Sequence, residues 1–156
     1  MIPRTNGRMR LCITLLVLNL AVIWGSSLIP GEISGAISRW VRDVLAAVFG
    51  FGSKDPEAGH GLLRKLGHLT EFACLGACLG WLLSMLGRNP WLSLLYGFPV
   101  ACLDETIQCF TPDRGPSFRD VCIDTAGLFL GSLLLLSGCA IYKNRKLKKS
   151  LGGQLK

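Results

Sequence analysis

Four apolar segments, each about as long as a bilayer is thick when helical, dominate this chain of 156 residues. Residues 11–29 contain no charged side chain, and residues 66–86, 90–110 and 121–142 carry charge only near one end. A transmembrane helix needs about 20 mostly apolar residues. Because the hydrocarbon core offers the backbone no water to bond, spanning segments there are helices or closed barrels. The pattern therefore predicts an all-α membrane protein with four transmembrane helices.

Basic residues mark the regions that we place in the cytoplasm. They occur in residues 1–10, at Arg88 and in residues 143–156, and none of the three regions contains an acid. Cytoplasmic loops carry an excess of Lys and Arg, so we predict cytoplasmic termini on either side of a transmembrane domain at residues 11–142. The net charge of +7 is then a topology signal, and we predict no nucleic-acid partner. The sequence Trp24-Gly25-Ser26 makes a poor cleavage site, which favours a retained first span over a signal peptide.

The segment after the first span has the pattern of an amphipathic helix. Its apolar residues recur at helical spacing, at Ile33, Ile37, Trp40, Val41, Val44, Leu45 and Val48. Such a helix lies in the membrane interface, so residues 32–49 predict an interfacial helix on the outer surface, with a cap over the bundle as the alternative. The glycine-rich residues 50–61 predict a flexible loop.

We predict that the small residues and the cysteines serve helix packing and not catalysis or ligand binding. Ala73 with Ala77, and Gly76 with Gly80, are pairs that let a neighbouring helix approach closely. Seven cysteines, an odd number, lie in or beside the apolar segments, where a thiol usually acts as a small apolar group. A disulfide between Cys109 and Cys122 stays open.

Ionisable and polar side chains gather near the outer ends of the last three spans. Because charge inside a membrane is costly, such residues are candidates for a functional site. The alternative is a structural lock that ties the helix ends together. The candidate binding residues are Lys65, His68, Glu71, Asp104, Glu105, Gln108, Arg114, Ser117, Asp120 and Asp124.

Several chemistries fit part of this set. His68, Glu105 and Asp120 are the candidates for general acid–base catalysis, although the sequence leans against an enzyme. Only one histidine is well placed, which matches no dedicated zinc set. Mg²⁺ or Ca²⁺ on the carboxylates stays open, but we predict no metal and no cofactor. Ser117 reads as the cap of the last span, with Asp120 at the third helical position of a capping box.

Two motif blocks resemble the VanZ-like family of membrane proteins. The first is Arg64-Lys65-x-x-His68-x-x-x-Phe72, where the family usually has tyrosine at the last position. The second block runs Asp104-Glu105-x-x-Gln108, Pro112-x-Arg114, Ser117-x-x-Asp120 and Gly127-x-x-x-Gly131, with Asp124 where the family often has asparagine. The Ser26-Ser27 pair, and Ser34 with Ser38, are similar to a looser pattern before these blocks. The resemblance covers about residues 15–135.

The resemblance implies a multi-pass protein of the bacterial cytoplasmic (inner) membrane with a shared polar site. The family takes its name from an accessory protein linked to teicoplanin resistance and has no agreed biochemical activity. We therefore predict a cell-envelope protein whose outward-facing site binds a membrane lipid or a lipid-linked or amphiphilic envelope molecule, with an effect on glycopeptide susceptibility. The alternatives are an intramembrane enzyme acting on a lipid headgroup and a small ion-coupled carrier. Homodimerisation stays open.

Overall fold

The computed structural model describes residues 7–50 and 60–154. The predicted loop at 50–61 therefore lies almost wholly outside the described residues. Within those ranges the secondary structure is helical, in agreement with the predicted all-α class. The elements are α1 (Gly7–Ser27), α2 (Gly31–Phe49), α3 (His60–Met85), α4 (Leu92–Gln108) and α5 (Phe118–Gln154).

The prediction of four helices that are long and apolar enough to span a membrane is wrong. Three described helical segments are long and apolar enough to cross a membrane, namely Gly7–Ser27, Gly61–Met85 and Phe118–Lys146. The predicted span at 90–110 yields only the 17 residues of α4, which rise about 25 Å at 1.5 Å per residue. Before it lies a tight turn, in which the N–H groups of Leu92, Ser93 and Leu94 donate to carbonyls three residues earlier and the Asn89 side chain accepts a hydrogen bond from the backbone of Trp91 at 3.0 Å.

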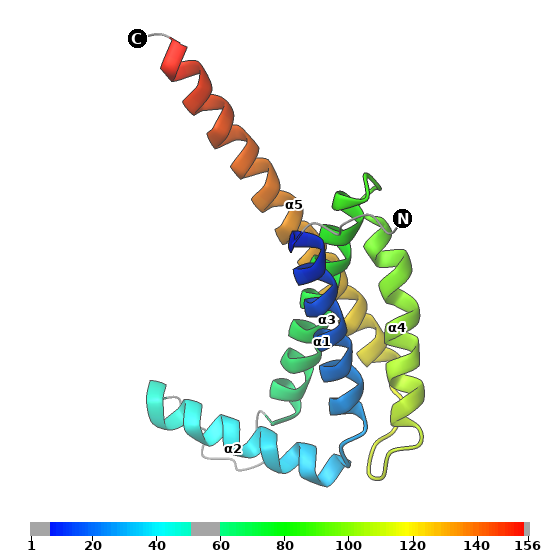
Figure 1. Ribbon diagram of the computed structural model, residues 1–156. Helices are drawn as coiled ribbons and strands as arrows, with labels where there is room; N and C mark the ends of the chain where they lie inside the picture. Colours follow the sequence, from blue (N-terminus) through cyan, green and yellow to red (C-terminus); the bar gives the residue numbers. More distant parts are fainter. Residues whose placement is uncertain (1–6, 51–59, 155–156) are drawn as a thin grey trace.

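Helices α1, α3, α4 and α5 pack against one another and run antiparallel in a bundle (Figure 1). Helix α4 runs alongside α3 and α5 (Figure 1). The start of α1 and the end of α5 both lie toward the same end of the bundle (Figure 1). The core consists of fully buried side chains from the four bundle helices, at Ile23, Phe72, Leu75, Ala101 and Leu128. This topology places the start of α3, the end of α4 and the start of α5 together at the opposite end.

Close packing of α3 on α5 depends on glycines. A Cβ at Gly131 of α5 would collide with the backbone carbonyl of Ala73, and a Cβ at Gly76 of α3 would collide with the carbonyl of Leu128. Contacts this close hold the two helices in one register, as the small-residue pairs predicted. That register places His68 of α3 opposite Asp124 of α5.

Helix α2 lies across the end of the bundle instead of running with it (Figure 1). Its start is tied to the loop after α4, because the Gly31 N–H donates a hydrogen bond of 2.9 Å to the Pro112 carbonyl. The apolar side chains of Ile33, Trp40 and Val48 are exposed. The predicted amphipathic helix is therefore present. It contacts α3 and projects sideways beyond the bundle (Figure 1).

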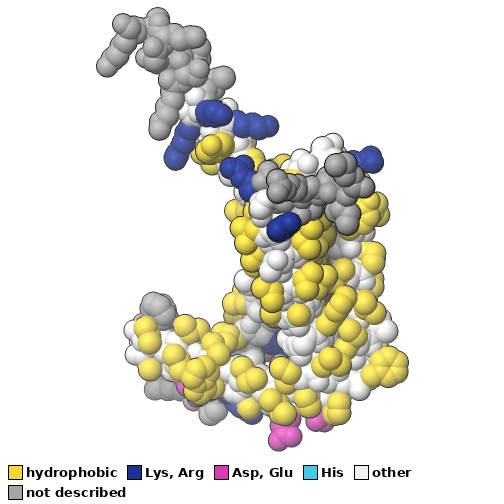
Figure 2. Space-filling view, viewed as in Figure 1, with side chains coloured by type: hydrophobic (Ala, Val, Ile, Leu, Met, Phe, Trp, Pro, Cys, Tyr) yellow, Lys and Arg dark blue, Asp and Glu magenta, His cyan; other side chains and the backbone are white. Residues whose placement is uncertain are grey.

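Charge is distributed unevenly between the two ends. In Figure 2 most visible Lys and Arg side chains gather where α1 begins and α5 extends beyond the bundle, and apolar side chains cover its flank.

All seven cysteines are free, and Cys109 and Cys122 are both exposed.

Candidate functional site

The polar end of the bundle is built by short segments of every helix. At the start of α3, Arg64, His68 and Glu71 are spaced four and three residues apart and so share one face. The last turns of α4 bring Asp104, Glu105 and Gln108. The loop after α4 brings Arg114, and the first two turns of α5 bring Asp120 and Asp124.

Asp104 is the most heavily bonded of the buried acids. It is fully buried, and its Oδ1 accepts a hydrogen bond of 2.6 Å from the Ser27 hydroxyl. Its Oδ2 accepts a bond of 2.9 Å from the Gln108 amide. The Thr111 hydroxyl in turn donates to the Ser27 carbonyl at 2.9 Å. Asp104 therefore points in a fixed direction, held by α1 and by its own helix.

His68 stands between two aspartates. Its Nδ1 lies 3.8 Å from Asp104 Oδ2 and 3.7 Å from Asp124 Oδ1. Both distances exceed the usual length of a hydrogen bond to nitrogen. All three residues are buried, and one ligand atom from each lies within 4.8 Å of the others. The trio is close enough to share a small positive ligand.

Glu105 connects the end of α4 to the start of α5. Its Oε2 accepts a hydrogen bond of 2.6 Å from the backbone N–H of Ser117, the residue before α5. In a capping box the carboxylate at the third helical position makes that bond, and here α4 supplies it in place of Asp120. This contact fixes the start of α5 relative to the end of α4.

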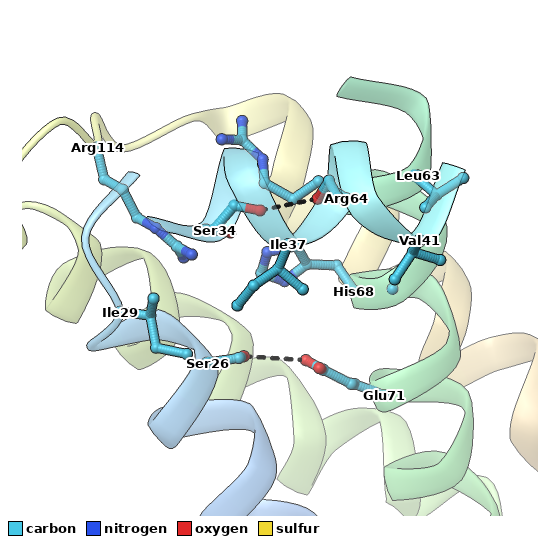
Figure 3. Close-up of a pocket in the computed structure, with 12 residues that line it drawn as sticks. Ser26, Ile29, Ser34, Ile37, Val41, Leu63, Arg64, His68, Glu71 and Arg114 are labelled. Carbon is cyan, nitrogen blue, oxygen red and sulfur yellow. Dashed lines mark hydrogen bonds between the residues drawn. The ribbon is translucent and has the colours of Figure 1, made fainter. Parts of the chain in front are cut away.

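A cavity of about 310 Å³ opens between α2, α3 and the loop after α4. Figure 3 shows its polar side chains, including Arg64, His68, Glu71 and Arg114, together with the apolar Ile29, Ile37, Val41 and Leu63. Glu71 is held by a hydrogen bond of 3.4 Å from the Ser26 hydroxyl to its Oε2. The cavity therefore has polar and apolar walls.

Arg114 carries the clearest sign of a missing partner. Its Nε and Nη1 are buried, and neither has a hydrogen-bond partner among the described residues. In Figure 3 the guanidinium points from the loop toward the cavity. Burial lowers the pKa of Arg114 from its ordinary value, and the positive charge of Arg64 acts in the same direction. The carboxylates of Asp104, Glu105 and Glu71 act in the opposite direction. An arginine remains charged under these conditions, so the group presents a positive charge and hydrogen-bond donors to the cavity.

The structure separates the ten predicted binding residues into groups. His68, Glu71 and Arg114 line the cavity, and Asp104, Gln108 and Asp124 lie buried behind it. Glu105 and Ser117 bond to each other, and Asp120 is buried nearby. Lys65 is exposed and does not line the cavity.

Sequence reasoning missed Arg64, Ser26 and Ser27 as members of the site. Arg64 lines the cavity, and its position four residues before His68, on the same helix face, was the available signal. Ser27 was noted only as part of a loose serine pattern. Its bond to Asp104 joins residues 77 positions apart, a pairing that spacing does not reveal.

Comparison with known proteins agrees with the motif blocks. Neither the curated proteins nor the solved structures contain a match to this chain. A family model described as VanZ/LLP1 matches residues 11–141, which include most of α1, all of α2, α3 and α4, the first part of α5 and all residues of the polar end. The chain therefore belongs to the VanZ/LLP1 family.

Proposed function

We propose that this protein binds the phosphate-bearing headgroup of an amphiphilic cell-envelope molecule in the cavity beneath α2. The observation that carries the proposal is the buried guanidinium of Arg114, with two N–H-bearing nitrogens that have no hydrogen-bond partner in the described part of the chain. Arginine matches phosphate oxygens with paired, charge-assisted hydrogen bonds. Arg64 lines the same cavity and adds a second positive charge.

The apolar wall supports an amphiphile over a free anion. Ile29, Ile37, Val41 and Leu63 line the cavity together with its polar groups, and the side chain of Ile37 is also 48% exposed. A volume of about 310 Å³ is at the lower limit for small-molecule sites, roughly 300–1,000 Å³. It suits a headgroup whose acyl chains remain in the bilayer.

We further propose that the cavity faces outward from the bacterial inner membrane. The basic regions at the other end of the bundle support this orientation, because positive charge favours the cytoplasmic side. A lipid-linked envelope precursor, including a peptidoglycan precursor, is then within reach of the site. Binding it would alter susceptibility to teicoplanin-type glycopeptides.

The proposal is for binding and not for catalysis. Of the three acid–base candidates, His68 lines the cavity, whereas Glu105 and Asp120 do not. Glu105 is instead engaged with the backbone of Ser117. Of those three candidates only His68 therefore faces the proposed headgroup, with Glu71 as the other ionisable acid–base group of the described lining.

The test is a titration of the purified full chain in detergent with short-chain phosphatidylglycerol, followed by native mass spectrometry. Diacylglycerol, which lacks the phosphate, is the comparison ligand. Arg114→Gln should weaken phosphatidylglycerol binding by about tenfold or more, because hydrogen bonds to charged groups contribute about 1.5–3 kcal/mol. Arg119→Gln is the matched control, since Arg119 is exposed and lies outside the cavity. Equal binding of the two lipids, or unchanged binding by Arg114→Gln, would contradict the proposal.

A further inference from the structure

We propose that His68, Asp104 and Asp124 form a binding site for one divalent first-row transition-metal ion, of the Mn²⁺ or Zn²⁺ kind. The three residues come from α3, α4 and α5, so the site would bridge three helices. This inference does not depend on lipid binding, because none of the three groups is the proposed phosphate ligand.

The distances suit a shared cation. A metal ion with bonds of about 2.0–2.2 Å to nitrogen and oxygen holds its ligand atoms roughly 3–3.6 Å apart. His68 Nδ1 lies 3.7 Å from Asp124 Oδ1 and 3.8 Å from Asp104 Oδ2. Small rotations of the three side chains would close this difference.

Unpaired buried atoms point to the same place. Asp124 is fully buried, and neither of its carboxylate oxygens has a hydrogen-bond partner within the described residues. His68 is 7% exposed, and its Nδ1 is likewise without a partner in that part of the chain. Buried polar groups are normally satisfied, and a metal ion would satisfy all three atoms together.

Asp104 is oriented as metal-binding carboxylates usually are. Hydrogen bonds from Ser27 and Gln108 fix its two oxygens, and Oδ2 keeps a further lone pair for a ligand. Such outer contacts hold a ligating carboxylate in place. Two buried carboxylates also favour a double positive charge, since an uncompensated buried charge is costly.

The donor set indicates the class of metal. One imidazole nitrogen with two carboxylates suits Mn²⁺, Fe²⁺ or Zn²⁺, whereas Mg²⁺ and Ca²⁺ prefer oxygen donors alone. The seven cysteines would bind a softer metal adventitiously. Mn²⁺ is therefore the better probe, because thiolates select softer ions.

The experiment measures Mn²⁺ binding to the chelator-treated full chain in detergent, from the loss of the free-ion electron paramagnetic resonance signal. We expect one Mn²⁺ per chain, displaced by Zn²⁺ and not by equimolar Mg²⁺. Asp124→Asn and His68→Gln should each weaken binding by at least about tenfold. Asp113→Asn is the control, because Asp113 is an exposed acid of the loop after α4, outside both the trio and the cavity lining, and it should bind Mn²⁺ as the wild type does.

A second measurement uses the wild-type chain alone, so it stands even if a variant fails to fold. Pulsed electron paramagnetic resonance should detect ¹⁴N coupling from the imidazole of His68 on bound Mn²⁺. Absence of stoichiometric binding, absence of ¹⁴N coupling, or equal binding by folded Asp124→Asn would each overturn the proposal. Arg114→Gln should lose phosphatidylglycerol and keep Mn²⁺, which separates this proposal from that of the lipid site.

Discussion

The carboxylate of Glu105 accepts a hydrogen bond of 2.6 Å from the backbone N–H of Ser117, and this contact joins the end of α4 to the start of α5. The first N–H groups of a helix have no partner within the helix, and a carboxylate at that position also interacts favourably with the helix dipole. Glu105 thus has a structural role at the edge of the polar cluster, while Arg114 and His68 face the cavity.

Replacing Glu105 should therefore affect stability according to whether an acceptor remains. Glu105→Ala removes the acceptor and should lower the unfolding free energy by about 1.5–3 kcal/mol, the usual contribution of a hydrogen bond to a charged group. Glu105→Gln keeps an amide oxygen and should lose less. Thermal unfolding in detergent measures both, and Ser117→Ala, which keeps the backbone N–H, is the control. Wild-type stability of Glu105→Ala would mean that the contact has no structural role.

The contact between α3 and α5 gives a second prediction. Gly131→Ala places a methyl group against the Ala73 carbonyl, and overpacking of this kind costs about 1–3 kcal/mol. Gly138→Ala is the matched control on the same helix, because a Cβ there has nothing within 4 Å. Unfolding of the two variants in detergent should differ clearly, with Gly131→Ala the less stable. Identical unfolding curves would show that the helices are less closely packed than the structure has them.

The exposed apolar face of α2 gives a third prediction. Trp40 is 66% exposed and Val44 is 42% exposed, which suits contact with lipid at the interface. Replacing both with Glu should increase amide hydrogen exchange across residues 31–49 in lipid nanodiscs. Asp43→Ala changes a polar neighbour and should leave the exchange unaltered. If the double variant exchanges as slowly as wild type, α2 is held by the bundle and not by lipid.

Orientation gives a fourth prediction. The segments around Arg88 and after Tyr142 are basic and contain no acidic residue. Because cytoplasmic loops carry an excess of Lys and Arg, reporter fusions after Leu86 and after Tyr142 should report the cytoplasm. A fusion inserted at Arg114 should report the outside. An external signal from the fusion after Tyr142 would reverse the orientation and place the cavity on the cytoplasmic side.

Much of the fold was predictable because its signals are local. A first span follows from the absence of charge in residues 11–29, and α2 follows from the helical spacing of its apolar residues. Both predictions use only residues that are close together in the sequence. The length of α4 was not predictable in this way. Composition alone extended it to Pro90 and Phe110, whereas the structure has a tight turn before Leu92 and the end of the helix at Gln108.

The site was predictable as a group of residues and not as an arrangement. His68 and Asp104 were predictable as site residues because both are ionisable and lie in or beside apolar segments. Placing such a residue in a membrane costs free energy, so it usually has a function. Which of them meet depends on contacts across the bundle, such as Ser27 with Asp104. The choice of Arg64 over Lys65 as a cavity residue depends on helix rotation, which adjacent basic residues do not reveal.

The most direct test of the proposed function is site-specific photocrosslinking in nanodiscs that contain phosphatidylglycerol and diacylglycerol in a known ratio. A photoreactive residue replaces Ile37, which lines the cavity, or Ile33, which lies on the same helix outside the cavity lining. The two positions have similar exposure, at 48% and 53%. The account predicts that adducts at Ile37 are enriched in phosphatidylglycerol relative to adducts at Ile33, and that Arg114→Gln removes the enrichment. The same lipid ratio at both positions in the wild-type chain would contradict it.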